Sequence, residues 1–164
     1  MLAGRTVDLL QDEKNQLDLL TGTSLCLTSL GRTLVLVHRP CAIDTNEWQA
    51  HIDALLAQRP SGVVVVVPPG CPGPSADQRR RLGSALAGLG DLPIGVLTRS
   101  ALHRHLITAI NWITGGGTRA FAPSHLADAM EYAAVPVEQR ATVAAKIAQL
   151  AHQMGIATDF PEVA

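Results

Sequence analysis

The sequence predicts an α/β domain with a mixed, mostly parallel central sheet of about five strands, about four flanking helices and an extra C-terminal helix. Two observations carry this prediction. Residues 63–67 are five consecutive valines, and a strand without a polar face is typical of a central strand covered on both sides. From residue 33 onward, apolar strand-like runs alternate with segments of helical periodicity, an order that gives parallel strands joined by right-handed crossovers.

The N-terminal part of the chain predicts a leader followed by a hairpin. Residues 1–21 mix leucines with acidic residues and indicate a leader that could include a short helix. The alternating run 24–29 and the apolar run 33–38, with Gly31 between them, indicate two antiparallel strands. We therefore expect this hairpin to add one antiparallel edge strand to a parallel sheet.

Capping residues mark the helices that follow. Asp44 stands at the N-cap position of the first one, and Glu47 three residues later gives a box-like start. Ser75 caps the helix after the valine strand, and Ser100 caps a third helix with Leu102 among its inward residues. The remaining predicted elements are strands over 93–98 and 118–122 and helices over 123–134 and 137–154. The expected division is a leader over 1–21, an α/β domain over 22–134, and a helix with a tail over 135–164.

Composition narrows the class of protein. The 164 residues are 47% apolar and 16% charged, which argues against disorder, and the net charge of −1 does not indicate nucleic-acid binding. No apolar run is long enough for a membrane span, and the start of the chain lacks the apolar core of a signal peptide. The three cysteines form no CxxC pair, so we expect a reduced, cytoplasmic protein without a metal or cofactor.

The loop after the valine strand is the expected working surface, because open α/β sheets bind ligands outside the carboxyl ends of their strands. The loop lacks the Gly-Lys-Ser/Thr of a P-loop, and Pro72 and Pro74 remove backbone donors that a dinucleotide cradle needs. The run 79–81 of three arginines usually forms a solvated face, and it could also dock an acidic partner. The candidate interaction surface consists of Gly70, Cys71, Gly73, Ser75, Asp77, Arg79, Arg80 and Ser100.

Several reactive side chains have both a structural and a functional interpretation. Ser75 is an N-cap, and a phosphate there would sit at a helix N-terminus near Arg79 and Arg80. Cys71 beside a helix start could be an activated thiol, but a phosphatase-type Cys-x5-Arg needs arginine at 77, where aspartate stands. His103 and His105 are two residues apart on a predicted helix and fall on different faces. We expect them to be solvated or capping rather than metal ligands, and we nominate no catalytic residue.

The order of elements resembles the STAS domain, the fold of anti-sigma factor antagonists and of the cytosolic tails of anion transporters. The segments 74–82, 101–112 and 119–121 are similar to those of bacterial STAS-like proteins of unassigned function. In regulatory members of the family, a partner kinase phosphorylates a serine or threonine at the start of the helix after the central strand, the position of Ser75. The family typically has an Asp-Ser-x-Gly turn there, whereas this chain has residues 71–75 in the order Cys-Pro-Gly-Pro-Ser.

The resemblance implies a non-enzymatic regulatory module that binds a protein partner, such as a kinase-linked regulator. A small-ligand or nucleotide-binding α/β protein that uses the 68–79 loop is the first alternative. A structural domain that forms homo-oligomers through its last helix is the second. A deep polar pocket beside Cys71 and Ser75 would favour the ligand-binding alternative, and a shallow convex surface would favour the interaction module.

Overall fold

The computed structural model describes residues 16–114 and 116–156, and these form a six-stranded sheet in the order β1-β2-β3-β4-β5-β6. The strands are β1 (Gln16–Thr21), β2 (Leu25–Leu30), β3 (Thr33–His38), β4 (Gly62–Val67), β5 (Ile94–Thr98) and β6 (Thr118–Phe121). The helices are α2 (Thr45–Gln58), α3 (Ala76–Ala87), α4 (Ala101–Thr114), α5 (Leu126–Tyr132) and α6 (Arg140–Gln153), with 3-10 turns η1 (Pro123–His125) and η2 (Val137–Gln139). Among these described residues, no helix has the length and apolar character needed to cross a membrane.

The α/β class is confirmed, but the sheet differs from the expected mostly parallel, five-stranded one. β2 pairs antiparallel with both β1 and β3, and only β3 to β6 pair in parallel. The extra strand is β1, which occupies residues 16–21. The prediction of a leader or short helix is therefore wrong for these residues. Residues 1–15, which belong to the same prediction, lie outside the described part. A bulge between Asp18 and Leu20 shifts the register of β1. That bulge interrupts the two-residue alternation by which a strand is recognised.

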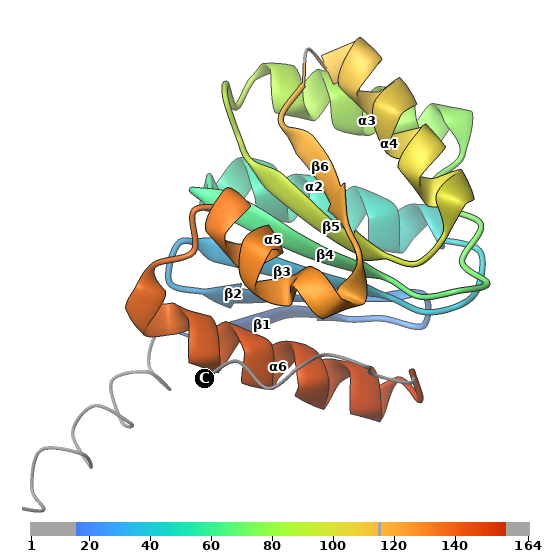
Figure 1. Cartoon of the computed structure of the whole chain (residues 1–164). Helices are drawn as coiled ribbons and strands as arrows, with labels where there is room; N and C mark the ends of the chain where they lie inside the picture. Colours follow the sequence, from blue (N-terminus) through green and yellow to red (C-terminus); the bar gives the residue numbers. More distant parts are fainter. Residues whose placement is uncertain (1–15, 115, 157–164) are drawn as a thin grey trace, which may run out of the picture.

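The sheet separates two apolar layers (Figure 1). Helices α2, α3 and α4 cover one face, and α5 and α6 cover the other. The valine run of β4 serves both layers: Val63, Val65 and Val67 pack with the first, and Val64 and Val66 with the second. The expectation that this strand is covered on both sides is therefore confirmed.

Two glycines let α5 approach the sheet closely. A Cβ atom on Gly62 would lie 1.6 Å from the carbonyl oxygen of Ala133, and one on Gly95 would lie 2.8 Å from that of Ala129. No other residue type fits at such separations, so β4 and β5 carry glycine where the end and the middle of α5 cross them.

The last helix packs on its own sheet. Val143, Ile147 and Leu150 of α6 are buried in the layer shared with α5. On the same helix, Lys146 is only 5% exposed, and its Nζ lies 3.1 Å from Oδ1 of Asp18 on β1. The apolar stripe that suggested a self-association surface thus packs against β3 and α5 within the same chain.

The start of α2 fastens the β1–β2 turn. Asp44 caps the helix as predicted, accepting from the backbone N–H of Glu47. Glu47 does not complete a box with Asp44, however: its carboxylate accepts hydrogen bonds from the backbone N–H groups of Thr23, Ser24 and Leu25 and from the hydroxyls of Thr23 and Ser24. Burial alone would raise the pKa of Glu47, but these hydrogen bonds hold it at about 2.

Candidate functional site

A cavity lies between the sheet and the three helices α2, α3 and α4, beneath the loop that follows β4. Its volume is about 90 Å³, and its wall includes Cys71, Gly73 and Pro74 of that loop. The strands contribute Leu36, His38, Val63, Val65, Val67, Ile94, Val96 and Thr118, and the helices contribute Trp48, His51, Leu55, Leu82, His103, Leu106 and Ile107. The wall is mostly aliphatic, so the pocket beside Cys71 exists but is far less polar than the ligand-binding alternative anticipated.

Three imidazoles converge on this cavity from different elements. His38 ends β3, His51 lies in the middle of α2, and His103 lies in the first turn of α4. They are 4%, 4% and 5% exposed. The indole of Trp48 lies beside two of them, with its ring centroid 5.0 Å from that of His51 and 6.3 Å from that of His38. The prediction of a solvated or capping histidine is therefore wrong for His103.

His103 forms a hydrogen bond to the loop after β4, where that loop covers the cavity. Its Nε2 contacts the carbonyl oxygen of Cys71, which can only accept, so Nε2 carries the proton. Nδ1 lies 3.1 Å from the hydroxyl of Thr98, and that hydroxyl accepts from the backbone N–H of Ser100. His103 thereby joins the end of β5, the start of α4 and the loop after β4, and both of its ring nitrogens are paired.

His38 and His51 are different, because their Nδ1 atoms are buried without a hydrogen-bond partner. Burial lowers the pKa of His38 to about 4, with a smaller contribution from His103. Burial also lowers the pKa of His51 to about 3, with a smaller contribution from His38. Both rings are therefore neutral at pH 7, and each offers hydrogen-bonding capacity that the protein does not use.

Cys71 is a wall residue of this cavity. Its side chain is 4% exposed, and burial raises the pKa of its thiol. A thiol in that state holds very little of the reactive thiolate at neutral pH, so the structure favours the interpretation of Cys71 as a small loop residue. Gly70 and Gly73 in the same loop have φ angles of 86° and 78°, which favour glycine.

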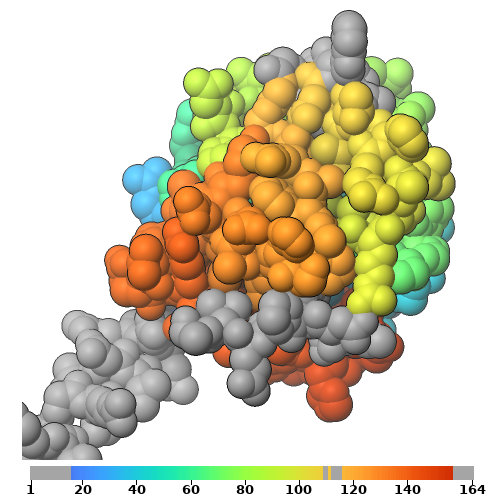
Figure 2. All heavy atoms as spheres, viewed as in Figure 1, coloured from blue at the N-terminus to red at the C-terminus, as the bar shows by residue number. Residues whose placement is uncertain are grey.

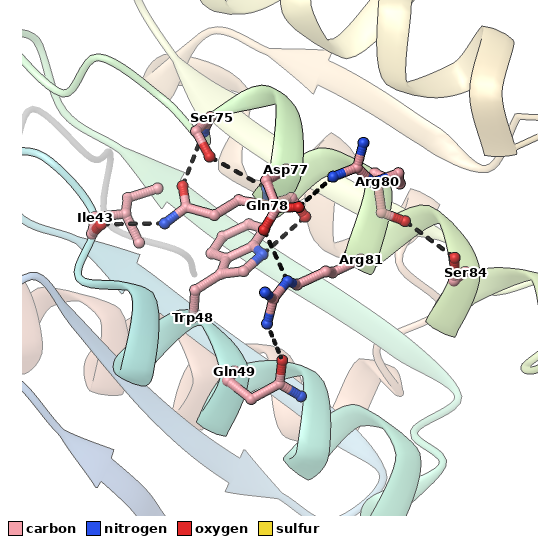
Figure 3. A network of polar contacts seen from close by, with 9 residues as sticks. All are labelled: Ile43, Trp48, Gln49, Ser75, Asp77, Gln78, Arg80, Arg81 and Ser84. Carbon is pink, nitrogen blue, oxygen red and sulfur yellow. Dashed lines mark hydrogen bonds and ion pairs between the residues drawn. The ribbon is translucent and has the colours of Figure 1, made fainter.

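A hydrogen-bond network connects the cavity to the start of α3 (Figure 3). Ser75 caps the helix as predicted, and it forms a complete capping box with Gln78. The side-chain amide of Gln78 also donates to the carbonyl oxygen of Ile43. The backbone carbonyl oxygen of Gln78 accepts from Nε1 of Trp48 at 2.9 Å. Trp48 therefore contacts the cavity with its ring while its N–H holds the first turn of α3.

The charged residues of the predicted surface are mostly paired with one another. Asp77 forms ion pairs with Arg80 and Arg81 within the helix, and the nearby guanidinium of Arg80 lowers the pKa of its carboxyl. Nη1 of Arg79 donates to the carbonyl oxygen of Pro74 at 2.8 Å. Exposed pairs of this kind contribute little to stability, in agreement with the expectation of a solvated face.

Ser100 caps α4 through a contact from the backbone N–H of His103 at 3.4 Å. The structure thus brings Gly73, Cys71 and Ser100 together around His103 at the roof of the cavity, while Asp77 and Arg80 point to solvent.

Leu102 was expected to face inward but is 62% exposed, because the buried stripe of α4 begins at His103 and continues through Ile107. The residues that sequence reasoning missed are His38, His51 and His103 as a group. The available signal was helical spacing: His51 shares a face with Trp48 and Leu55.

A second hollow lies on the opposite layer, between β6 and α5. It has a volume of about 410 Å³, and Figure 2 shows the face to which β6 and α5 contribute. The guanidinium of Arg119 lies over the rings of Phe121 and Tyr132, at 5.2 Å and 5.9 Å from their centroids. The rest of the wall consists of exposed charged side chains, including a pair between His125 and Asp128.

Within the described residues, no group of three or more histidine, cysteine, aspartate or glutamate side chains is arranged to hold a metal ion. Comparison with known proteins finds no matching family model, no matching curated protein and no matching solved structure. The resemblance to STAS domains accordingly stays a prediction, and the function must be argued from the site.

Proposed function

We propose that the chain is a binding module, not an enzyme, and that it holds a small, uncharged, largely apolar molecule in the cavity beneath the loop after β4. The observation that carries the proposal is the cavity itself, with two buried imidazoles on its wall that have unpaired nitrogens. The cavity lies on one face of the sheet, and its end at His38 and Val67 reaches the carboxyl ends of parallel strands, the region where α/β proteins bind ligands.

The volume of the cavity determines how much free energy a bound molecule can gain by filling it. An empty cavity costs about 24 cal/mol per Å³, so a volume of about 90 Å³ costs roughly 2 kcal/mol when nothing fills it. A molecule that filled this space would recover that free energy as binding. The wall excludes one class of ligand: no aspartate, glutamate, lysine or arginine is among the described lining residues, so a buried ionic group would have no counter-charge.

Benzene is a suitable first probe, because it enters apolar cavities without needing hydrogen bonds. We expect benzene to raise the unfolding temperature and to change the fluorescence of Trp48, measured in a Trp112→Phe background that leaves one tryptophan. A variant that carries Val65→Ile and Val96→Ile adds two methyl groups to the cavity wall and should lose this response.

Val64→Ile is the matched control. It adds one methyl group on the other face of β4, where Val64 is fully buried against α5 and α6. It should keep the benzene response while costing about 1 kcal/mol by overpacking. No response in the wild-type protein, or an equal response in the filled variant, would contradict the proposal.

A regulatory interaction module of the STAS type is the second candidate. Its support is the resemblance of the sequence together with one geometric observation: Ser75 is exposed at the N-terminus of α3, and the guanidinium of Arg79 is held at the adjoining carbonyl of Pro74. A phosphate on Ser75 would meet the helix dipole and this guanidinium, and it would compete with Gln78 for the capping position.

The test combines mass spectrometry with two variants that both keep a good N-cap. Phosphopeptide analysis of protein from its own cells should find modification at Ser75. Ser75→Asp adds a negative charge and should change which protein partner is bound, whereas Ser75→Asn keeps the cap without the charge and should behave as wild type. Unmodified Ser75 together with identical partners for both variants would leave the residue as a cap alone.

A further inference from the structure

The strand register gives the cavity a length. Its wall follows one face of β4 through Val63, Val65 and Val67. These three residues span four steps along a strand, or roughly 13 Å at about 3.3 Å per residue. The neighbouring strands extend the wall along the same direction: Leu36 pairs in register with Val65, and Ile94 pairs with Val63. A volume of about 90 Å³ is roughly three times the 30 Å³ of a water molecule, so the space along this wall suits a small, slender molecule such as a short alkyl chain.

The two ends of this cavity differ in polarity. His38 lies beside Val67 at the carboxyl end of the strands, in the row that follows the paired Val37 and Val66. His51 belongs to the same end, because its imidazole lies against Trp48, whose ring also neighbours His38. The middle of the cavity and most of its other end are aliphatic, with Thr118 as the polar residue there.

The polar end provides hydrogen bonds without charge. Nδ1 of His38 and Nδ1 of His51 are both unpartnered, whereas His103 has both nitrogens paired. The two unpartnered imidazoles are neutral at pH 7, because burial lowers the pKa of His38 to about 4 and that of His51 to about 3. A hydroxyl group can donate or accept and therefore suits either tautomer, whereas a carboxylate would be buried without a cation.

We propose that the ligand is an uncharged, single-chain amphiphile whose alkyl chain lies along β4 and whose hydroxyl-type head reaches His38 and His51. This inference rests on the proposed function and adds the class of ligand. The loop containing Gly73 closes the polar end: a Cβ atom on Gly73 would lie 3.0 Å from Cδ1 of Leu106, so loop and α4 touch where the head would enter.

The test is a series of straight-chain 1-alkanols from methanol to hexanol, titrated against the full chain with Trp112→Phe and measured by Trp48 fluorescence and calorimetry. Each added methylene should increase the affinity about fourfold until the chain is longer than the cavity. At pH 7.5, the carboxylate of equal chain length should bind at least about tenfold more weakly than the alcohol.

Two variants locate the head group. His51→Leu should remove much of the preference for 1-butanol over n-pentane, and His51→Asn, which keeps a hydrogen-bonding group near the position of Nδ1, should retain it. Because the readout is a ratio of two affinities, a general loss of stability does not reproduce it. A ratio unchanged by His51→Leu would overturn the placement of the head at this end.

The benzene experiment separates the two levels of the proposal. If benzene binds but the alkanols show no dependence on chain length, or the carboxylates bind better, the amphiphile is wrong and the cavity remains a ligand site. If neither benzene nor any alkanol binds, both proposals fail.

Discussion

Replacing Glu47 by glutamine tests whether a single carboxylate fastens the β1–β2 turn to α2. The wild-type carboxylate accepts five hydrogen bonds from Thr23, Ser24 and Leu25. A glutamine side chain offers one acceptor oxygen and turns its NH₂ group toward backbone donors. At least two N–H groups then lose their partner, at about 1–3 kcal/mol each for buried groups and less here because the turn is partly exposed.

The titration of Glu47 gives a second measure of the same interaction. The decrease of its pKa from 4.5 to about 2 corresponds to roughly 3 kcal/mol of stabilisation of the ionised form in the folded state. We therefore expect Glu47→Gln to lower the free energy of unfolding by about 3 kcal/mol at pH 7, measured by urea denaturation. The contribution is complete above pH 4.5 and is lost as the pH decreases toward 2, so the difference between wild type and variant should shrink over that range.

Glu131→Gln is the matched control, because the side chain of Glu131 is 75% exposed and its contact with Nη1 of Arg140 is long, at 4.0 Å. That substitution should change the free energy of unfolding by less than about 1 kcal/mol. A loss for Glu47→Gln no larger than that of the control, or a difference from wild type that does not depend on pH below 4.5, would refute the reasoning.

Three further predictions concern packing, buried histidines and helix capping. Gly62→Ala should lower stability by about 3 kcal/mol or more, because its Cβ would overlap the end of α5, whereas Gly88→Ala, with no contact closer than 3.5 Å, should be nearly neutral in urea denaturation. Below pH 6.5 stability should decrease by up to about 1.4 kcal/mol per pH unit for each of His38 and His51, because the unfolded chain takes up protons that the folded imidazoles do not; a flat profile from pH 6.5 to 4 would contradict this. Ser75→Ala should cost about 0.5–2 kcal/mol of thermal stability, and Ser75→Asp should restore most of it.

Much of the fold could be predicted from the sequence, because the relevant signals are local. The valine run, the prolines after it and the capping residues Asp44 and Ser75 each act through neighbouring residues, and the structure confirms them. β1 was missed for an equally local reason: the bulge between Asp18 and Leu20 breaks the alternation that marks a strand. The role of Glu47 was predicted in part, since its spacing from Asp44 fits a capping box but its partners lie more than 20 residues away.

The candidate site was much less predictable, because it is formed by residues that are far apart in the sequence and meet only in the fold. His38 and His51 come from the consecutive elements β3 and α2, whereas β4, α3 and β5 lie between these and His103 on α4. Only the parallel order of β3, β4 and β5 brings the three residues to one end of a cavity. A cavity also depends on how closely side chains from different elements pack together, and no local residue pattern shows this. The sequence did indicate the correct region, since the loop after β4 forms its roof.

The cavity and the predicted regulatory surface are parts of one hydrogen-bonded unit, and this decides how the two candidate functions relate. Trp48 lines the cavity and donates to Gln78, which in turn closes the capping box with Ser75 (Figure 3). A ligand that displaced the indole would weaken its hydrogen bond to the first turn of α3, and a change at Ser75 would reach the cavity wall by the same two contacts. By linkage, any effect of Ser75→Asp on ligand affinity must equal the difference between the effects of that substitution on the free energy of unfolding with and without the ligand. Measuring alkanol affinity in Ser75→Asp and Ser75→Asn therefore tests the connection directly: equal affinities would show that the cavity and the start of α3 act independently.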